Sequence, residues 1–353
     1  MPDARPPIYI ALNEPDALGG IQRVVGALYR GLTGAGRDVP ILGVRRSAEP
    51  TGTIGDGIPT VFPFRPLRPR AIVDRVNRGG MRVERSLPLW RRDGVRHLRR
   101  VLEAKPGHVI AMDVFAAELV AQVAAAPGTR RIVQYHNSFG ALDGTRDMDR
   151  LRAAAVHFDL FLALTQADAE KFAPVMPIPT LAMANPLPFE PQARTGPRSR
   201  RVVSIGRLSA VKSVETLVRA WAQIPAAARA GWVVSVAGTG PEAAPLTNLV
   251  TELGLADHVE LLGACQDTRA LLRDSEILAL SSRFEGLPMV LLEAMSQEVA
   301  CIATDSSPGV HELLGDGRGV LVPVGDPLSL AARLEDLLVD DELRGRVAAA
   351  GLA

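Results

Sequence analysis

Short apolar runs alternate with amphipathic stretches through the first half of the chain. The apolar runs are rich in Ile, Val and Leu, which is typical of buried strands. They are 8–12, 108–112, 131–135 and 160–164. Between them, apolar residues recur every three or four positions, which predicts helices over 21–36, 114–125 and 147–157. This alternation predicts a parallel sheet covered by helices, with functional side chains at the carboxyl ends of its strands.

The alternation stops at Asn185–Arg200 and then restarts. This segment contains four prolines and little apolar periodicity, so it is predicted to be a linker. Further strands are predicted at 201–206, 232–238, 259–263, 276–280, 301–304 and 319–323, and helices at 213–223, 242–253, 289–297 and 327–339. We therefore expect two Rossmann-like, doubly wound α/β domains that face each other across a cleft. Their predicted bounds are 1–187 and 200–353, joined by the linker 188–199.

Length and composition agree with two globular domains. A chain of 353 residues holds roughly two domains of ordinary size. Its 47% hydrophobic and 22% charged residues exclude disordered, collagen-like and coiled-coil classes. The two cysteines, Cys265 and Cys301, form neither a disulfide framework nor a metal-binding knuckle, which favours a reducing compartment. We find neither a signal-peptide pattern nor an apolar run long enough to span a membrane, so we expect a cytoplasmic protein.

The charge distribution is uneven. The net charge of +1 conceals a basic segment, 65–100, which holds twelve arginines and three acidic residues. Residues 1–187 carry a net charge of +7, whereas residues 188–353 carry −6. Apolar residues also give part of 65–102 an apolar side: Leu87, Leu89, Trp90, Val95, Leu98, Val101 and Leu102.

This basic segment has three interpretations. It is a solvated surface, or it docks on anionic lipid or a lipid-phosphate acceptor, or it binds an anionic soluble acceptor. The second interpretation predicts peripheral contact of 65–102 with the inner face of the cell membrane. The same apolar residues equally fit the core face of an ordinary helix. Sparse aromatic residues and the lack of a binding motif argue against nucleic acid as a partner.

The string Ser281–Ser296 is the strongest chemical feature. It follows the predicted strand 276–280, and its two carboxylates, Glu285 and Glu293, are eight residues apart. Gly286 allows a ligand to approach the backbone, and Pro288 suits the first turn of a helix. Free N–H groups at that helix start would suit phosphate or sugar oxygens. Either glutamate alone would more often be an ordinary turn or surface residue; the whole string predicts a binding site.

Two cations follow the first predicted strand after the linker. Arg207 and Lys212 lie just beyond 201–206, close to a predicted helix start. An arginine fork and a lysine point charge together suit a diphosphate. Taken singly, each would more often be a surface charge, but Lys212 is one of only three lysines in the sequence.

Several motifs in this order and spacing carry a resemblance to a known family. They are Gly206-Arg207-Leu208 with Lys212, Gly238-Thr239-Gly240-Pro241, and Glu285-Gly286-Leu287-Pro288 with Glu293, preceded by Gly19-Gly20 and His136. Together they resemble the retaining, nucleotide-sugar-dependent glycosyltransferases of the GT-B fold, family 4. The resemblance covers most of the chain and is strongest from 201 to 323.

The resemblance implies a role for each motif residue. Arg207 and Lys212 would hold the donor diphosphate and stabilise it as a leaving group, Glu285 would contact sugar hydroxyls, and His136 would reach the sugar from the other domain. Glu293 would hold the donor ribose. The nucleotide base would lie near Gly263 and Cys265. The remaining implied donor-binding residues are Gly19, Gly20, Gly206, Gly238, Gly286, Leu287, Pro288 and Met289.

The implied donor is a nucleotide-diphospho-sugar, with UDP the expected nucleotide, and it is a co-substrate. We expect no cofactor and no metal. The acceptor is left open among a lipid-linked glycan, a cell-envelope glycan and a natural product. A non-catalytic sugar-nucleotide sensor and a GT-B-like epimerase or phosphorylase stay as alternatives.

Two shorter motifs allow other chemistry. Gly238–Ala243 fits a dinucleotide-binding G-x-G-x-x-A, but it follows the second strand of its domain, where a nicotinamide enzyme would place it on the first. Asp147-Met148-Asp149 spells a metal-binding D-x-D, yet acids in the first turn of a helix also favour the helix dipole. His136 likewise fits an ordinary core histidine.

Overall fold

The computed structural model describes residues 5–16, 19–44, 46, 58, 60–61, 87–187 and 189–353, without the side chains of 61 and 87–93. Residues 65–86 of the basic segment and Pro188 therefore lie outside the described residues. The chain divides into two compact units, Met1–Pro186 and Leu187–Ala353, which we call unit 1 and unit 2.

Unit 1 is built on a seven-stranded parallel sheet with the strand order β3-β2-β1-β4-β5-β6-β7. Its strands are β1 (Ile8–Leu12), β2 (Ile41–Gly43), β3 (Thr60–Val61), β4 (His108–Ala111), β5 (Arg131–Gln134), β6 (Leu160–Ala163) and β7 (Thr180–Ala182). Its helices are α1 (Gly20–Gly34), α3 (Leu87–Ala104), α4 (Val114–Val120), η2 (Phe139–Ala141), α5 (Arg146–Ala155) and α6 (Gln166–Phe172). The order reverses between β1 and β4, which makes their carboxyl ends the switch point of the sheet.

Helix α3 shows which interpretation applies to some of the apolar residues of the basic segment. Val95, Leu98 and Leu102 are buried in the core of unit 1, and Val101 packs against the same core. These residues are therefore the core face of an ordinary helix and are not available to a membrane surface. The arginines of this helix whose side chains are described, Arg96, Arg99 and Arg100, are exposed.

Unit 2 repeats the architecture with a six-stranded parallel sheet in the order β10-β9-β8-β11-β12-β13. Its strands are β8 (Ser199–Ile205), β9 (Val233–Ala237), β10 (Val259–Gly263), β11 (Ser275–Leu280), β12 (Ala300–Thr304) and β13 (Val320–Val322). Its helices are α7 (Val214–Gln223), α8 (Ala243–Glu252), α9 (Thr268–Arg273), α10 (Met289–Met295), α11 (Pro308–Leu314), α12 (Pro327–Val339) and α13 (Asp341–Leu352). Here the switch point lies between β8 and β11.

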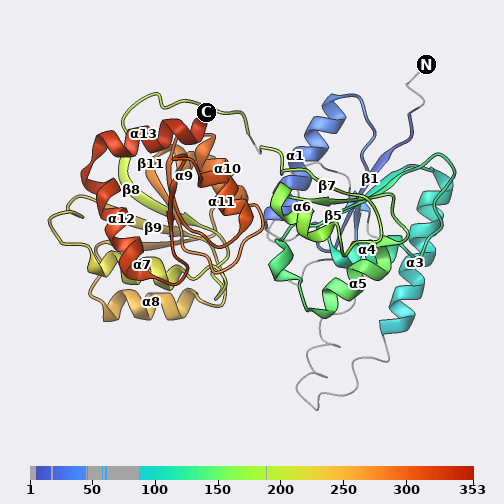
Figure 1. Cartoon of the computed structure of the whole chain (residues 1–353), viewed down its shortest axis with the longest axis horizontal. Helices are drawn as coiled ribbons and strands as arrows, with labels where there is room; N and C mark the ends of the chain where they lie inside the picture. The colour runs from blue at the N-terminus through green and yellow to red at the C-terminus, as the bar shows by residue number, and fades with distance from the viewer. Residues whose placement is uncertain are drawn as a thin grey trace, which may run out of the picture. The chain divides into compact units, whose positions relative to one another are not determined.

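The strands of unit 2 bury both faces. Val202 of β8 belongs to a core shared with α7, α8, α12 and α13, whereas its neighbour Val203 belongs to a second core shared with α9, α10 and α11. Figure 1 shows these two sets of helices on opposite sides of the sheet. Because both faces are covered, β11 and β12 are buried at every position, whereas the edge strand β10 is partly exposed. This explains the nearly continuous apolar runs of the inner strands in the sequence.

A buried ion-pair network fixes the last helix of unit 2. The Glu276 carboxylate, at the start of β11, accepts two hydrogen bonds from Arg194 at 3.0 and 2.7 Å. Its Oε2 also lies 3.4 Å from Nε of the buried Arg344 on α13. The Arg344 guanidinium stacks over the Trp232 ring at 5.1 Å from its centroid. Segments far apart in the sequence are thus tied to one carboxylate.

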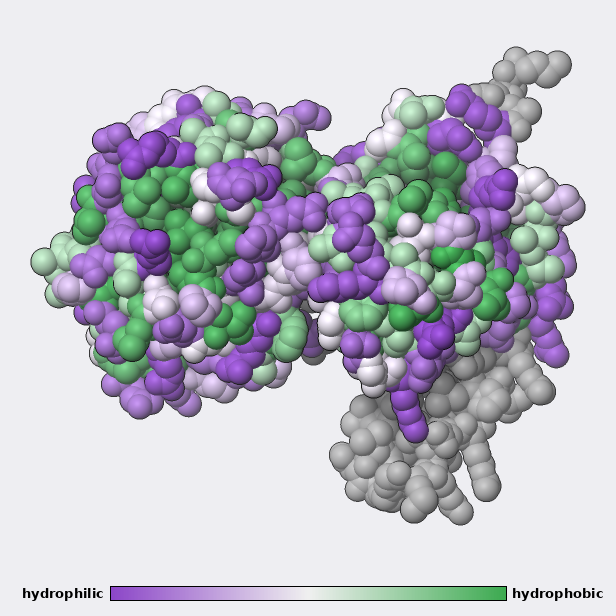
Figure 2. Space-filling model, in the orientation of Figure 1, coloured by the Kyte–Doolittle hydropathy of each residue, from purple (hydrophilic) through white to green (hydrophobic). Residues whose placement is uncertain are grey.

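Hydrophilic residues cover much of the surface of each unit in Figure 2. Within the described part of the chain, no helix has the length and apolar character needed to cross a membrane.

Candidate functional site

The loop after β8 begins the site at the switch point of unit 2. Leu208 N donates to Thr239 O at 2.8 Å, and Leu208 O accepts from Glu242 N at 3.1 Å. These bonds hold the loop against the loop after β9. The Arg207 side chain is exposed and, among the described residues, has no ion-pair partner. Arg207 is therefore available to an anionic ligand.

Glycines make this close contact of two loops feasible. Gly238 has φ +152°, and a Cβ placed on it would lie 1.8 Å from the Gly206 carbonyl oxygen. Gly240 has φ +156°, and its Cβ would lie 2.1 Å from the Leu208 carbonyl oxygen. A side chain at either position would displace the loop that carries Arg207. The G-x-G pattern here accommodates protein backbone, which gives the glycines a reason other than dinucleotide binding.

The turn after β11 supplies the first glutamate. Glu285 is 7% exposed, and its Oε1 accepts a hydrogen bond from Ser282 Oγ at 2.5 Å. The following Gly286 carbonyl accepts from Ser307 Oγ at 3.0 Å, and a Cβ on Gly309 would lie 2.1 Å from that carbonyl oxygen. The start of α11, with its N-cap Ser307, therefore packs against this turn. Sequence reasoning missed Ser282, Ser307 and Gly309 as supporting residues, since serines and glycines after strands are common.

Lys212 and Glu285 come together from the loops after β8 and β11. Lys212 Nζ lies 2.6 Å from Glu285 Oε1, with side-chain exposures of 29% and 8%. These two strands are neighbours in the sheet, so their carboxyl ends deliver both side chains to one place. Among the described residues, Lys212 Nζ and Glu285 Oε2 have no further partner. The pair therefore keeps N–H donors for a phosphate and an oxygen for a hydroxyl.

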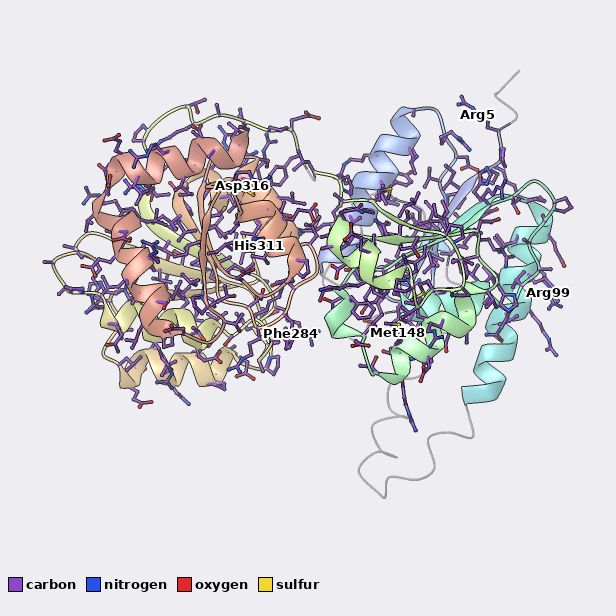
Figure 3. The ribbon with its side chains drawn as sticks, in the orientation of Figure 1. Arg5, Arg99, Met148, Phe284, His311 and Asp316 are labelled. Atoms are coloured by element: carbon purple, nitrogen blue, oxygen red, sulfur yellow. The ribbon has the colours of Figure 1, made fainter. Side chains whose placement is uncertain are left out.

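The second glutamate and its neighbours lie on and before α10. Glu293 is 1% exposed on this helix. Pro288 caps the helix, and the side chains of Leu287 and Met289 are buried, so in this stretch a ligand would meet backbone. Phe284 is 55% exposed beside Glu285 (Figure 3).

The residues predicted near the base lie at the end of β10. Gly263 has φ +67° and accepts a hydrogen bond from Gly238 N at 2.7 Å, which links this loop to the loop after β9. Cys265 is half-buried against the core formed with α9, α10 and α11.

The predicted residues of unit 1 lie after two different strands. Gly19 caps α1 in extended conformation, and Gly20 is the first residue of that helix. His136 follows β5, and its Nε2 is buried and has no hydrogen-bond partner among the residues that the structure describes. Burial lowers the pKa of His136 to about 4, while a hydrogen bond with Asn185 opposes the shift. The imidazole is therefore neutral near pH 7.

The D-x-D acids lie in the first turn of α5. Thr145 Oγ1 caps this helix by accepting from Met148 N at 3.3 Å, and Met148 is buried between the two acids (Figure 3). Asp147 Oδ1 accepts from Arg150 Nη1 at 2.6 Å. Across the described residues, no three acidic, His or Cys side chains are grouped to hold a metal ion.

Comparison with known proteins shows what this part of the chain is similar to. Residues 189–352 match the glycosyl transferases group 1 family. This match covers nearly all of unit 2. Anabaena HepE, solved in complex with UDP, has a TM-score of 0.77 at 17% identity over 98% of this chain and 93% of its own. The fold is GT-B, with two Rossmann-like, doubly wound domains.

Curated relatives align over part of their length. An amylovoran biosynthesis glycosyltransferase of Erwinia amylovora is 30% identical over 153 residues, which is 43% of this chain and 42% of that protein. An exopolysaccharide phosphotransferase of Streptomyces coelicolor is 33% identical over 222 residues, which is 60% of this chain and 23% of that protein. The chain thus spans less than half the length of these relatives.

Proposed function

We propose that this protein is a retaining glycosyltransferase that moves a sugar from a UDP-linked donor to a growing polysaccharide or lipid-linked glycan. The contact between Lys212 and Glu285 carries the proposal, because it lies in a part of the chain that matches the group 1 glycosyltransferases. Arg207 and Lys212 also line the same small hollow. UDP is favoured because HepE was solved with it. A polysaccharide acceptor is favoured because two relatives are named for amylovoran and exopolysaccharide chemistry.

The two cations act on the leaving group. When the bond from the sugar to the diphosphate breaks, negative charge develops on the diphosphate oxygens. Lys212 Nζ offers its remaining N–H donors, and Arg207 offers a planar fork. Charges placed in advance where charge develops lower the barrier, and removal of one such donor typically reduces the rate ~10²- to 10³-fold.

The two glutamates hold the neutral parts of the donor. Glu285 Oε1 already accepts from Lys212 and Ser282, which fixes the direction of the carboxylate. Its Oε2 then accepts a hydrogen bond from a sugar hydroxyl. Glu293 is assigned to the ribose hydroxyls, and the backbone of Gly286–Met289 to the sugar. The roles of Gly19, Gly20 and His136 toward the donor stay predictions.

A product assay with labelled UDP-sugars tests the proposal. We expect transfer of the sugar to an acceptor with retention of the anomeric configuration, measured by NMR of the product. Glu285→Gln keeps the size of the side chain and removes its charge, so it should reduce transfer ~100-fold without unfolding the protein. Unchanged transfer in Glu285→Gln would overturn the assignment of the site.

The same assay separates the other candidate functions. A sensor binds UDP-sugar, seen as a rise in Tm, without turnover over a broad acceptor panel. An epimerase returns the nucleotide sugar with an inverted hydroxyl, and a phosphorylase requires phosphate as the acceptor. Sugar found on a glycan acceptor excludes all three.

We further propose that the acceptor is anionic or lipid-linked and that the basic segment attracts it at the inner face of the cell membrane. The twelve arginines of 65–100 support this, since a cation near an anionic membrane contributes about 1 kcal/mol. Arg91→Gln, Arg92→Gln and Arg100→Gln together should weaken flotation with anionic vesicles and leave the UDP-induced rise in Tm unchanged. Equal flotation of variant and wild type would leave the segment a solvated surface.

A further inference from the structure

Unit 1 contains a pocket on the edge of its sheet opposite to the predicted functional residues. The pocket has a volume of about 350 Å³ and lies where β4 and β5 begin, between the end of α3 and the turn before β5. His136, by contrast, follows the carboxyl end of β5. The volume is within the range of small-molecule sites.

Arg131, the first residue of β5, contributes an unusual charge to this pocket. The residue is 4% exposed and forms part of the lining. Its Nη1 donates to Val120 O at 3.0 Å, and among the described residues the guanidinium has no other acceptor and no ion pair. The nearby Asp159 carboxylate is occupied, since it accepts from Arg131 N at 2.7 Å and from Arg130 Nη1 at 3.0 Å.

A buried cation is unfavourable when its charge is only partly compensated, as it is here by Asp159, which makes no direct contact with the guanidinium. Burial lowers the pKa of Arg131, and the charge of the nearby Asp159 offsets this shift only in part. An anion in the pocket would pair with the free N–H donors of the guanidinium and offset this desolvation. The lining therefore favours a negatively charged group at its inner end.

The other residues that line the pocket indicate which chemical moiety carries the anionic group of the ligand. Leu102, Val109 and Val123 are buried apolar residues of the wall, and Ala125 lies exposed at the turn. The side chains of Arg99, which comes from α3 (Figure 3), and of Glu103 lie at the exposed side. Two cations and one carboxylate leave a net positive charge above apolar walls.

We propose that this pocket is an accessory site that binds a small amphipathic anion, in which a phosphate or carboxylate is attached to a short apolar chain. The site is separate from glycosyl transfer, because it lies at the amino ends of the strands and involves none of the donor-binding residues. Its occupancy would stabilise unit 1 whether or not the protein transfers sugar.

Calorimetric titration with octyl phosphate tests the site, with octanol and inorganic phosphate as matched probes. We expect octyl phosphate to bind at least tenfold more tightly than either. Arg131→Gln should weaken octyl phosphate about ten- to hundredfold, because a charge-assisted hydrogen bond is lost, and leave octanol unchanged. Ala125→Phe, at an exposed position, should block the pocket without disturbing the core. His97→Gln, on the same helix as Arg99 but outside the lining, should bind like wild type.

Equal binding of octyl phosphate and octanol, or full octyl phosphate binding by Ala125→Phe, would overturn the proposal. Flotation with phosphatidylcholine vesicles, with and without phosphatidic acid, then identifies the source of the anion. If Ala125→Phe reduces flotation with the anionic vesicles, the ligand is a lipid headgroup. If flotation is unchanged while octyl phosphate binding is lost, the ligand is a soluble anion.

Discussion

The two units share a fold but differ in how their predicted functional residues are held. In unit 2, Lys212 and Glu285 reach each other from adjacent strands, and serine hydroxyls and glycine backbones support them. In unit 1, Gly19 and Gly20 follow β1, whereas His136 follows β5. The donor chemistry that we propose for unit 2 therefore depends on a single compact switch point.

The electrostatics of the two regions differ as well. Unit 2 presents the Lys212–Glu285 ion pair, in which Lys212 keeps N–H donors that have no partner in the described part of the chain, and the exposed Arg207 lines the same small hollow. This arrangement suits a charged diphosphate. Unit 1 presents a neutral, buried histidine at its carboxyl edge. At the carboxyl edge of each sheet, the predicted residues of unit 2 thus include a charged pair, whereas the predicted histidine of unit 1 is neutral.

Lys212→Ala is expected to give the largest effect. It removes a cation from the diphosphate and leaves the Glu285 carboxylate buried without its counterion, so transfer should fall ~10²- to 10³-fold. Steady-state kinetics with the labelled donor measure this loss. Lys171→Ala, an exposed lysine of unit 1, is the matched control and should keep wild-type rates. Similar losses in both variants would remove the distinction between the units.

Gly238→Ala tests the close contact of the two loops in unit 2. The new Cβ would meet the Gly206 carbonyl, and the backbone conformation there is one that only glycine readily adopts. The free energy of unfolding of unit 2 should therefore fall by about 3 kcal/mol. Denaturant titration measures the change. Gly254→Ala is the control: it has φ +64° and no heavy atom within 4 Å of the new Cβ, so its loss should be about 1 kcal/mol. Equal losses would show that conformation alone, and not the loop contact, requires glycine.

The strands buried on both faces of unit 2 could be predicted well from the sequence. The runs 276–280 and 301–304 correspond closely to β11 and β12, because strands that are buried at every position are rich in apolar residues. Short strands at the edge of unit 1 escaped prediction. In β7, Leu181 and Ala182 are exposed, so no burial pattern marks the strand.

Helix α13 was also missed, for a different reason. One of its few buried residues is Arg344, which is buried because Glu276 pairs with it from β11. A contact between residues so far apart in the sequence leaves no periodic apolar signal. The candidate site shows the same limit: the motifs predicted Lys212 and Glu285, whereas their pairing and the supporting Ser307 depend on the fold.

His136→Gln tests the neutral histidine of unit 1. The pKa of about 4 lies below the ordinary value of 6.5, so the unfolded chain takes up a proton first as the pH falls. The stability from the neutral imidazole is complete above pH 6.5 and is lost toward pH 4. Between pH 7 and 4.5, wild type should lose about 2–3 kcal/mol of unfolding free energy more than His136→Gln.

Denaturant titrations at the two pH values give these free energies. His157→Gln, an exposed histidine of the same unit, controls for substitution alone. Parallel losses in wild type and His136→Gln would mean that the imidazole is solvated, and the contrast with the charged site of unit 2 would disappear.

The smallest effect is expected from the double variant Asp147→Asn, Asp149→Asn. It tests whether these two acids of unit 1 bind a metal ion, whereas the chemistry proposed for unit 2 requires none. Both acids lie in the first turn of α5, where an exposed carboxylate contributes about 0.5 kcal/mol through the helix dipole. The double variant should therefore lose about 1 kcal/mol of stability by denaturant titration, and its transfer rate should match wild type with or without chelator. A rate that rises with Mn²⁺ in wild type but not in the variant would instead make these acids metal ligands. A metal ion, and not only Arg207 and Lys212, would then stabilise the charge on the leaving group.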